Sequence, residues 1–184
     1  MRNVIKATLV TIIAFMLQST FMPYLSINGV CGSLNIALIA IVTVILGRKY
    51  TFGVSCLIGI LMEMQMSSIR IAYVAAYPIL SMLFTIPFVD MSAQKRERRH
   101  QMHKSTEDRD PRLRTLLDAI CISSSIEALI LLYLSLMGTV ITLQLIIKSL
   151  TAVVYTALIT IIIMHPLRGF LRPKEIKASG KGVT

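Results

Sequence analysis

The sequence predicts an all-α membrane protein with six transmembrane helices and both termini in the cytoplasm. Hydrophobic residues make up 55% of the 184 residues and charged residues only 15%, whereas soluble domains average about 25% charged residues. The apolar residues form six continuous stretches that do not alternate with polar ones. This pattern favours helices over barrel strands, because a helix satisfies its own backbone hydrogen bonds in lipid.

The basic residues predict the orientation. Almost all of them flank the first and sixth stretches or fall in alternate gaps: Arg2, Lys6, Arg48, Lys49, Lys95, Arg96, Arg98, Arg99, Lys104, Arg109, Arg112, Arg114, Arg168, Arg172, Lys174, Lys177 and Lys181. The other three gaps contain only Arg70. Because loops rich in Lys and Arg stay in the cytoplasm, the net charge of +10 needs no nucleic acid partner to explain it.

The first three spans are expected at about 4–22, 30–46 and 51–66. The first ends near Pro23, and no small-x-small cleavage site follows it, so we expect a retained helix rather than a signal peptide. The second ends at Gly47 and the basic pair after it. The third runs to a short outer turn at 67–68.

The last three spans are expected at about 69–89, 116–137 and 140–164. The fourth contains Pro78 and Pro87, which transmembrane helices tolerate. The sixth ends at Pro166 with the histidine before it. Turns at 67–68 and 138–139 are short enough to make hairpins of spans three and four and of spans five and six.

These spans leave room for one domain, the six-helix bundle at 1–171, and for no separate catalytic module. A cytoplasmic loop at about 91–115 carries a basic run that suits anionic lipid, including Lys95, Arg96, Arg98 and Arg99. The tail at 172–184 is basic and contains Gly and Ser, and we expect it to be disordered.

Three ionisable residues, Glu63, Glu127 and Lys148, fall deep inside the predicted spans. An ionised group at the bilayer centre costs at least ~2.5–3.5 kcal/mol, so each should face protein and find a partner. Glu127 lies eleven residues before Gly138 and Lys148 ten after it, which places both about 15 Å from the turn. We therefore expect Glu127 to pair with Lys148. Glu63 either joins them or meets Arg70.

Small residues at i, i+4 spacing mark the expected helix contacts, because they let helices approach closely. They are Ser55 and Gly59 on span three, Ala72 and Ala76 on span four, Ala119 and Ser123 on span five, and Ala152 and Thr156 on span six. Together with the ionisable residues they predict a polar core in the outer half of the bundle. A role in fixing helix register is the simpler interpretation, and transport or catalysis the alternative.

No constellation for catalysis, cofactor binding or metal binding is present. The three cysteines form no CxxC pair, and His100 with His103 lacks a third ligand. The sequence also contains no Gly-rich phosphate loop and no His-Glu-x-x-His motif. We expect a protein that is not an enzyme and has no cofactor.

Short motifs in the first third resemble the MreD family of bacterial rod-shape-determining proteins. They are Leu17-Gln18-Ser19-Thr20 with Pro23 after it, Asn35 before the apolar run to Gly47-Arg48-Lys49, and Gly53 with Gly59-Ile60-Leu61-Met62-Glu63. The family usually has Asp at the last position, where this chain has Glu63. Chain length, span count and inside termini also fit the family.

The resemblance implies a non-enzymatic scaffold of the cell-elongation machinery in the bacterial inner membrane. Such proteins associate with MreC, and through it with the MreB filament, a RodA-type glycosyltransferase and a class B penicillin-binding protein in peptidoglycan synthesis. The family's bundle resembles the substrate-binding subunits of energy-coupling-factor transporters. A vitamin-binding transport subunit is therefore the main alternative, although the predicted outer loops are poor in polar and aromatic side chains.

Overall fold

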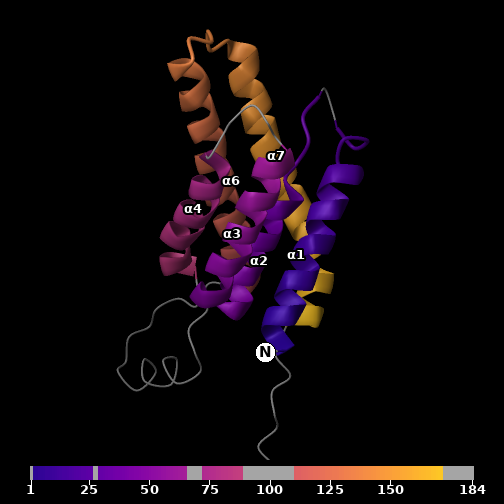
Figure 1. Ribbon diagram of the computed structural model, residues 1–184. Helices are drawn as coiled ribbons and strands as arrows, with labels where there is room; N and C mark the ends of the chain where they lie inside the picture. Colours follow the sequence, from indigo (N-terminus) through magenta and orange to yellow (C-terminus); the bar gives the residue numbers. More distant parts are fainter. Residues whose placement is uncertain (1, 27–28, 66–71, 89–109, 172–184) are drawn as a thin grey trace, which may run out of the picture.

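The computed structural model describes residues 2–26, 29–65, 72–88 and 110–171, and they form six helices (Figure 1). The helices are α1 (Arg2–Thr20), α2 (Leu34–Leu46), α3 (Arg48–Gln65), α4 (Ala72–Phe88), α6 (Pro111–Leu136) and α7 (Leu143–Leu171). The predicted all-α class is confirmed for these residues.

The helices run alternately up and down, so that one end of the bundle collects the basic residues. In Figure 1, α1, α3 and α6 begin at the lower end, and α2, α4 and α7 end there. We call this the basic end and the opposite one the far end. Apart from Lys148, every described Lys and Arg lies near the start or finish of a helix at the basic end: Arg2, Lys6, Arg48, Lys49, Arg112, Arg114 and Arg168.

α2 is the centre of the bundle. It contacts each of the other five described helices, and every residue from 34 to 44 is buried. A helix that is apolar on all sides belongs in a core, and only Asn35 and Thr43 interrupt this one. With 13 residues, α2 is ~20 Å long.

α2 begins at Leu34, later than the predicted residue 30, because the preceding residues are bound to neighbouring helices. The Gln18 side chain of α1 accepts a hydrogen bond from Leu34 N at 2.6 Å and donates one to Gly32 O at 3.3 Å. A Cβ at Gly32 would lie 2.5 Å from Cδ1 of Ile159 in α7. Ser33 then caps the helix by accepting a hydrogen bond from Ile36 N.

The predicted end of the last span at Pro166 is wrong, since α7 continues to Leu171. A helix can continue past proline where its surroundings compensate for the lost hydrogen bond. Here Leu171 is buried, Lys6 of α1 donates to Phe170 O at 3.2 Å, and Arg168 donates to Thr115 Oγ1 of α6 at 3.4 Å. These contacts stabilise the final turns.

α3 and α4 pack most closely where α3 has a glycine. A Cβ at Gly59 would lie 2.9 Å from the carbonyl oxygen of Tyr73 and 3.1 Å from the Cα of Val74. Gly53, two turns earlier on α3, would meet nothing within 4 Å. The close approach of the two helices therefore depends on one of the two glycines.

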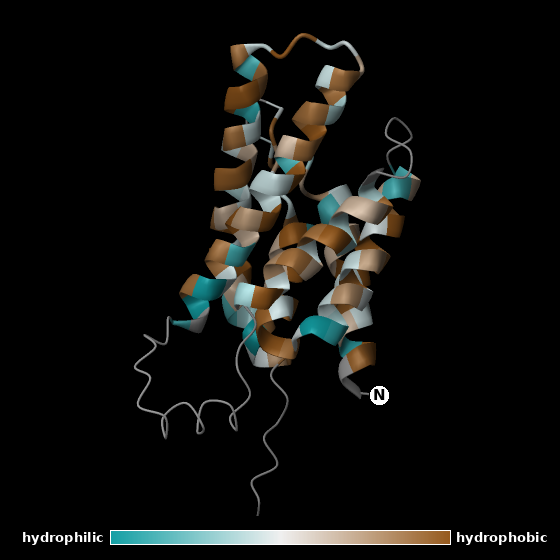
Figure 2. Cartoon of the chain, turned by 90° about the vertical axis from the view of Figure 1, so that its left-hand side faces the viewer, coloured by the Kyte–Doolittle hydropathy of each residue, from teal (hydrophilic) through white to brown (hydrophobic). Residues whose placement is uncertain are grey.

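Among the described residues, two helices are long and apolar enough to cross a membrane: residues 112–136 of α6 and 143–171 of α7. Only 22% and 17% of their most apolar windows are buried, so they are not core helices, and Figure 2 shows hydrophobic residues along most of their length. Three shorter apolar helices accompany them, at Val4–Thr20, Leu34–Leu46 and Tyr73–Pro87.

Candidate functional site

A cluster of polar side chains lies between α2, α3, α4 and α6 toward the far end. We call it the far-end cluster, and it consists of Ser33, Asn35, Glu63, Tyr73, Tyr77 and Glu127. Asn35 is fully buried in the first turn of α2 and donates to the sulfur of Met62 at 3.5 Å, next to Glu63. Its side-chain oxygen is buried without a hydrogen-bond partner among the described residues.

Two tyrosines of α4 connect the carboxylates of the far-end cluster. The rings of Tyr73 and Tyr77 lie 6.1 Å apart at 42°, and both are buried. The charges of Glu63 and Glu127 both act on Tyr73, and Ser33 lies beside the Tyr77 hydroxyl. Glu63 and Glu127 therefore both lie near Tyr73, and the part of the tyrosines in this cluster was not predicted from the sequence.

Lys148 does not join them. Its side chain is exposed, whereas Glu127 is half-buried and faces Ser149 of α7. The predicted level holds approximately, because Ser149, the residue after Lys148, faces Glu127. The rotation of α7 differs: consecutive side chains of a helix point ~100° apart, so Lys148 faces outward where Ser149 faces α6.

The small residues of the predicted stripes are mostly buried, but not all in the contacts that we expected. Ala119 and Ser123 of α6, and Ala152 and Thr156 of α7, are buried. Thr156 Oγ1, however, accepts a hydrogen bond from Ser33 N at 2.9 Å, so this part of α7 packs on the start of α2. Ser55 and Gly59 are buried on α3, and Ala76 is half-exposed on α4.

Some predicted residues lie outside the described ranges. They are Arg70 and the loop residues Lys95, Arg96, Arg98 and Arg99, and for Ala72 only the backbone is described.

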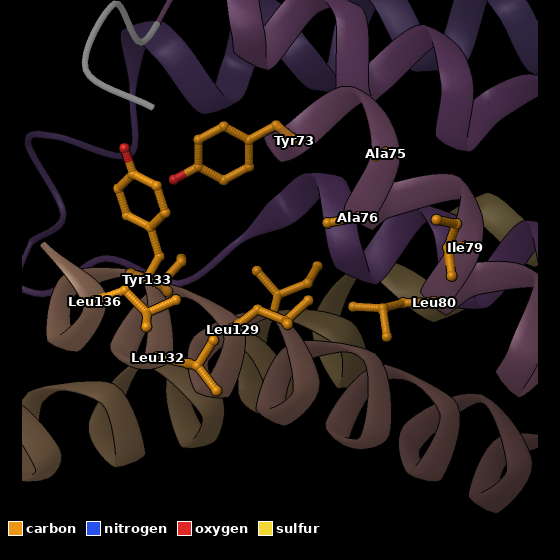
Figure 3. A pocket seen from close by; sticks show the side chains of 11 residues that line it. Tyr73, Ala75, Ala76, Ile79, Leu80, Leu129, Leu132, Tyr133 and Leu136 are labelled. Carbon is orange, nitrogen blue, oxygen red and sulfur yellow. The ribbon is translucent and has the colours of Figure 1, made fainter. Parts of the chain in front are cut away.

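A groove of about 500 Å³ lies between α4 and α6, beside the far-end cluster (Figure 3). Its lining is aliphatic except for two tyrosines: Tyr73, Ala75, Ala76, Ile79 and Leu80 of α4, and Ile126, Leu129, Ile130, Leu132, Tyr133 and Leu136 of α6. In Figure 3 the hydroxyls of Tyr73 and Tyr133 point toward the same end of the groove. We call it the α4–α6 groove.

Sequence reasoning missed Asp118, a fully buried carboxylate near the basic end. Its neighbour Thr43 of α2 donates a hydrogen bond to Ile39 O at 2.8 Å, and neither carboxylate oxygen has a hydrogen-bond partner among the described residues. The predicted span began at 116, which put Asp118 at the membrane boundary. One sequence feature could have predicted its burial: Asp118 lies beside Ala119 and four residues before Ile122, on the buried face of α6.

Asp118 also changes the expected distribution of polar groups. Buried hydroxyls accompany it at the basic end, including those of Thr43, Thr51, Thr85 and Thr115. The polar interior thus extends through the whole bundle and is not confined to the outer half.

Among the described residues, no group of three His, Cys, Asp or Glu side chains could hold a metal ion, and the thiols of Cys31, Cys56 and Cys121 are free. No family model, curated protein or solved structure matches the chain.

Proposed function

We propose that this protein is a non-enzymatic, six-spanning scaffold of a bacterial inner membrane, similar to the MreD proteins of the cell-elongation machinery. The observation that carries the proposal is an apolar surface that a bilayer alone would not cover. It belongs to the far half of the α6–α7 pair.

The two long helices extend beyond the rest of the bundle. α6 has 26 residues and α7 has 29, or ~39 and ~43 Å, against ~25–28 Å for α1, α3 and α4. Figure 1 shows their far ends rising above the other helices. If the basic ends lie together at the cytoplasmic face, the hairpin extends past the ~30 Å hydrocarbon core.

We call residues 132–150, at the far end of the α6–α7 pair, the hairpin tip. Its large apolar side chains are exposed: Leu132, Leu136, Met137, Val140, Ile141, Leu143, Ile146, Ile147 and Leu150. A contiguous exposed apolar patch marks an interaction site. Lys148 is the one charged residue of the tip, so it would pair with an acidic group of the partner.

The partner that the resemblance favours is MreC, with its membrane helix and the periplasmic segment next to it. Through MreC the chain would meet the MreB filament, a RodA-type glycosyltransferase and a class B penicillin-binding protein. The tightly packed α2 would keep the hairpin in a fixed orientation. The scaffold would thus act by presenting a rigid surface.

The test is affinity purification of the tagged protein from its native membranes in mild detergent, with quantitative mass spectrometry. The double variant Val140→Ser with Leu143→Ser disrupts the tip outside the groove, and Ile162→Ser, at an exposed position on the lower half of α7, is the control. We expect MreC and cell-wall synthases with the wild type and the control, and their loss with the double variant.

Two results would overturn the proposal. Equal recovery of partners with all variants would show that the tip is not the interface. Recovery of paired ATPases with a coupling membrane subunit would instead identify a vitamin-type transport subunit. The aliphatic lining of the α4–α6 groove argues against that alternative, because a polar vitamin needs several convergent polar groups.

A further inference from the structure

We propose that the α4–α6 groove binds one hydrocarbon chain of a membrane phospholipid from the outer leaflet. The inference rests on the membrane placement proposed above, but it concerns a different ligand and a surface that overlaps the hairpin tip only at Leu132, Tyr133 and Leu136. Three properties of the groove carry it: its length, the position of its polar groups and its walls.

The groove is about one leaflet deep. Its lining runs from 73 to 80 on α4 and from 126 to 136 on α6, which is ~10–15 Å along the helices. Half of a ~30 Å hydrocarbon core is ~15 Å. A partner's transmembrane helix would cross both leaflets, and it would need a groove along the whole of α4 and α6.

The polar groups of the groove lie at one end only. Tyr73 is in the first turn of α4 and Tyr133 in the last turn of α6, so both hydroxyls lie at the far end (Figure 3). Tyrosine is enriched at the headgroup level of membranes, where its ring is in hydrocarbon and its hydroxyl can meet water or a headgroup. The lining below is aliphatic, as the lower part of a lipid chain requires.

The walls of the groove also suit a hydrocarbon chain. The small side chains of Ala75 and Ala76 form part of its wall on α4, and the exposed Ile79 and Leu132 lie at its rim. This shape admits one flexible chain from the side.

The experiment uses the full-length protein in bilayer nanodiscs of phosphatidylethanolamine and phosphatidylglycerol with a trace of diazirine-chain phosphatidylcholine. After photolysis, labelled residues are identified by peptide mass spectrometry. We expect labelling concentrated on α4 and α6 residues of the groove, well above that of exposed apolar positions on α1 such as Ile5 and Ile12.

Two variants test the groove itself. Ala76→Leu fills it and should lower its labelling about tenfold, equivalent to ~1.4 kcal/mol of binding free energy. Tyr133→Phe keeps the ring and removes one hydroxyl, and should lower the labelling by a smaller factor. The matched control is Ala128→Leu, at an exposed position of α6 outside the groove, which should leave the labelling unchanged.

Labelling spread evenly over all exposed helices, or equal labelling in Ala76→Leu and Ala128→Leu, would overturn the lipid site. Loss of groove labelling when a partner protein is added would identify a partner helix as the occupant, and would also overturn it. No labelling on any helix would instead contradict the proposal that the helices lie in a membrane. The failure of the lipid site is thereby distinguished from the failure of the proposed function.

Discussion

α2 and the α6–α7 hairpin are both apolar, yet the fold uses them in opposite ways. The side chains of α2 from 34 to 44 are at most 8% exposed, whereas Leu136 and Val140 at the hairpin tip are 78% and 80% exposed. α2 is short and surrounded by helices, and the hairpin is long and covered on one side. Hydropathy therefore identifies an apolar helix but not whether its neighbours are protein or an outside partner.

The largest difference between these regions should appear on truncating a buried isoleucine of α2. Ile39 is 0% exposed, so Ile39→Ala removes packed methyl groups and leaves a cavity, which costs ~2–5 kcal/mol. Ile162→Ala, at a 72% exposed position of α7, should cost less than ~0.5 kcal/mol. Thermal unfolding in detergent compares the two, and equal losses would mean that α2 is not the structural core.

Replacing each of the two glycines of α3 with alanine should change the stability of the protein in opposite directions. Gly59→Ala places a Cβ against the backbone of α4 and should destabilise the protein by ~1–3 kcal/mol, as overpacking does. Gly53→Ala meets nothing and should stabilise it by ~0.5–1 kcal/mol through helix propensity. Thermal melts of both variants test the close α3–α4 contact. A loss of stability in Gly53→Ala but not in Gly59→Ala would contradict it.

Asp118→Asn should raise the stability slightly, by ~1 kcal/mol. The amide has the shape of the carboxyl group, carries no charge and can donate to Thr43 Oγ1, so it removes the cost of burying an acid without a partner. Asp118→Leu, which cannot hydrogen-bond, is the comparison. A marked loss of stability in Asp118→Asn would show that the negative charge itself is needed, for example by a cation.

The smallest effect on stability is expected for Lys148→Ala. Because Lys148 is exposed and Glu127 faces Ser149, the change should remain within ~0.5 kcal/mol while lowering partner recovery in the affinity experiment. A different result would support the ion pair predicted from sequence spacing. In that case Lys148→Ala would destabilise the protein, and the charge swap Glu127→Lys with Lys148→Glu would not.

The sequence was informative about elements and poor about contacts. The six helices could be located because their apolar runs are continuous, and the basic gaps anticipated which helix ends lie together. The Glu127–Lys148 pair could not be predicted correctly, because the rotation of α7 decides that Ser149 and not Lys148 faces Glu127. Asp118 was missed because a shift of five residues in the start of α6 turns a boundary residue into a buried one.

The sequence by itself determined the all-α class, the approximate helices and the collection of positive charge at one end, because hydropathy and charge are properties of the chain alone. Only the tertiary structure decided which apolar helix is central, which glycine is a contact, and where Tyr73 and Tyr133 meet a groove. These depend on helix rotation and depth, to which distant residues such as Gln18, Gly32 and Tyr155 contribute. A local pattern cannot encode contacts made across such separations.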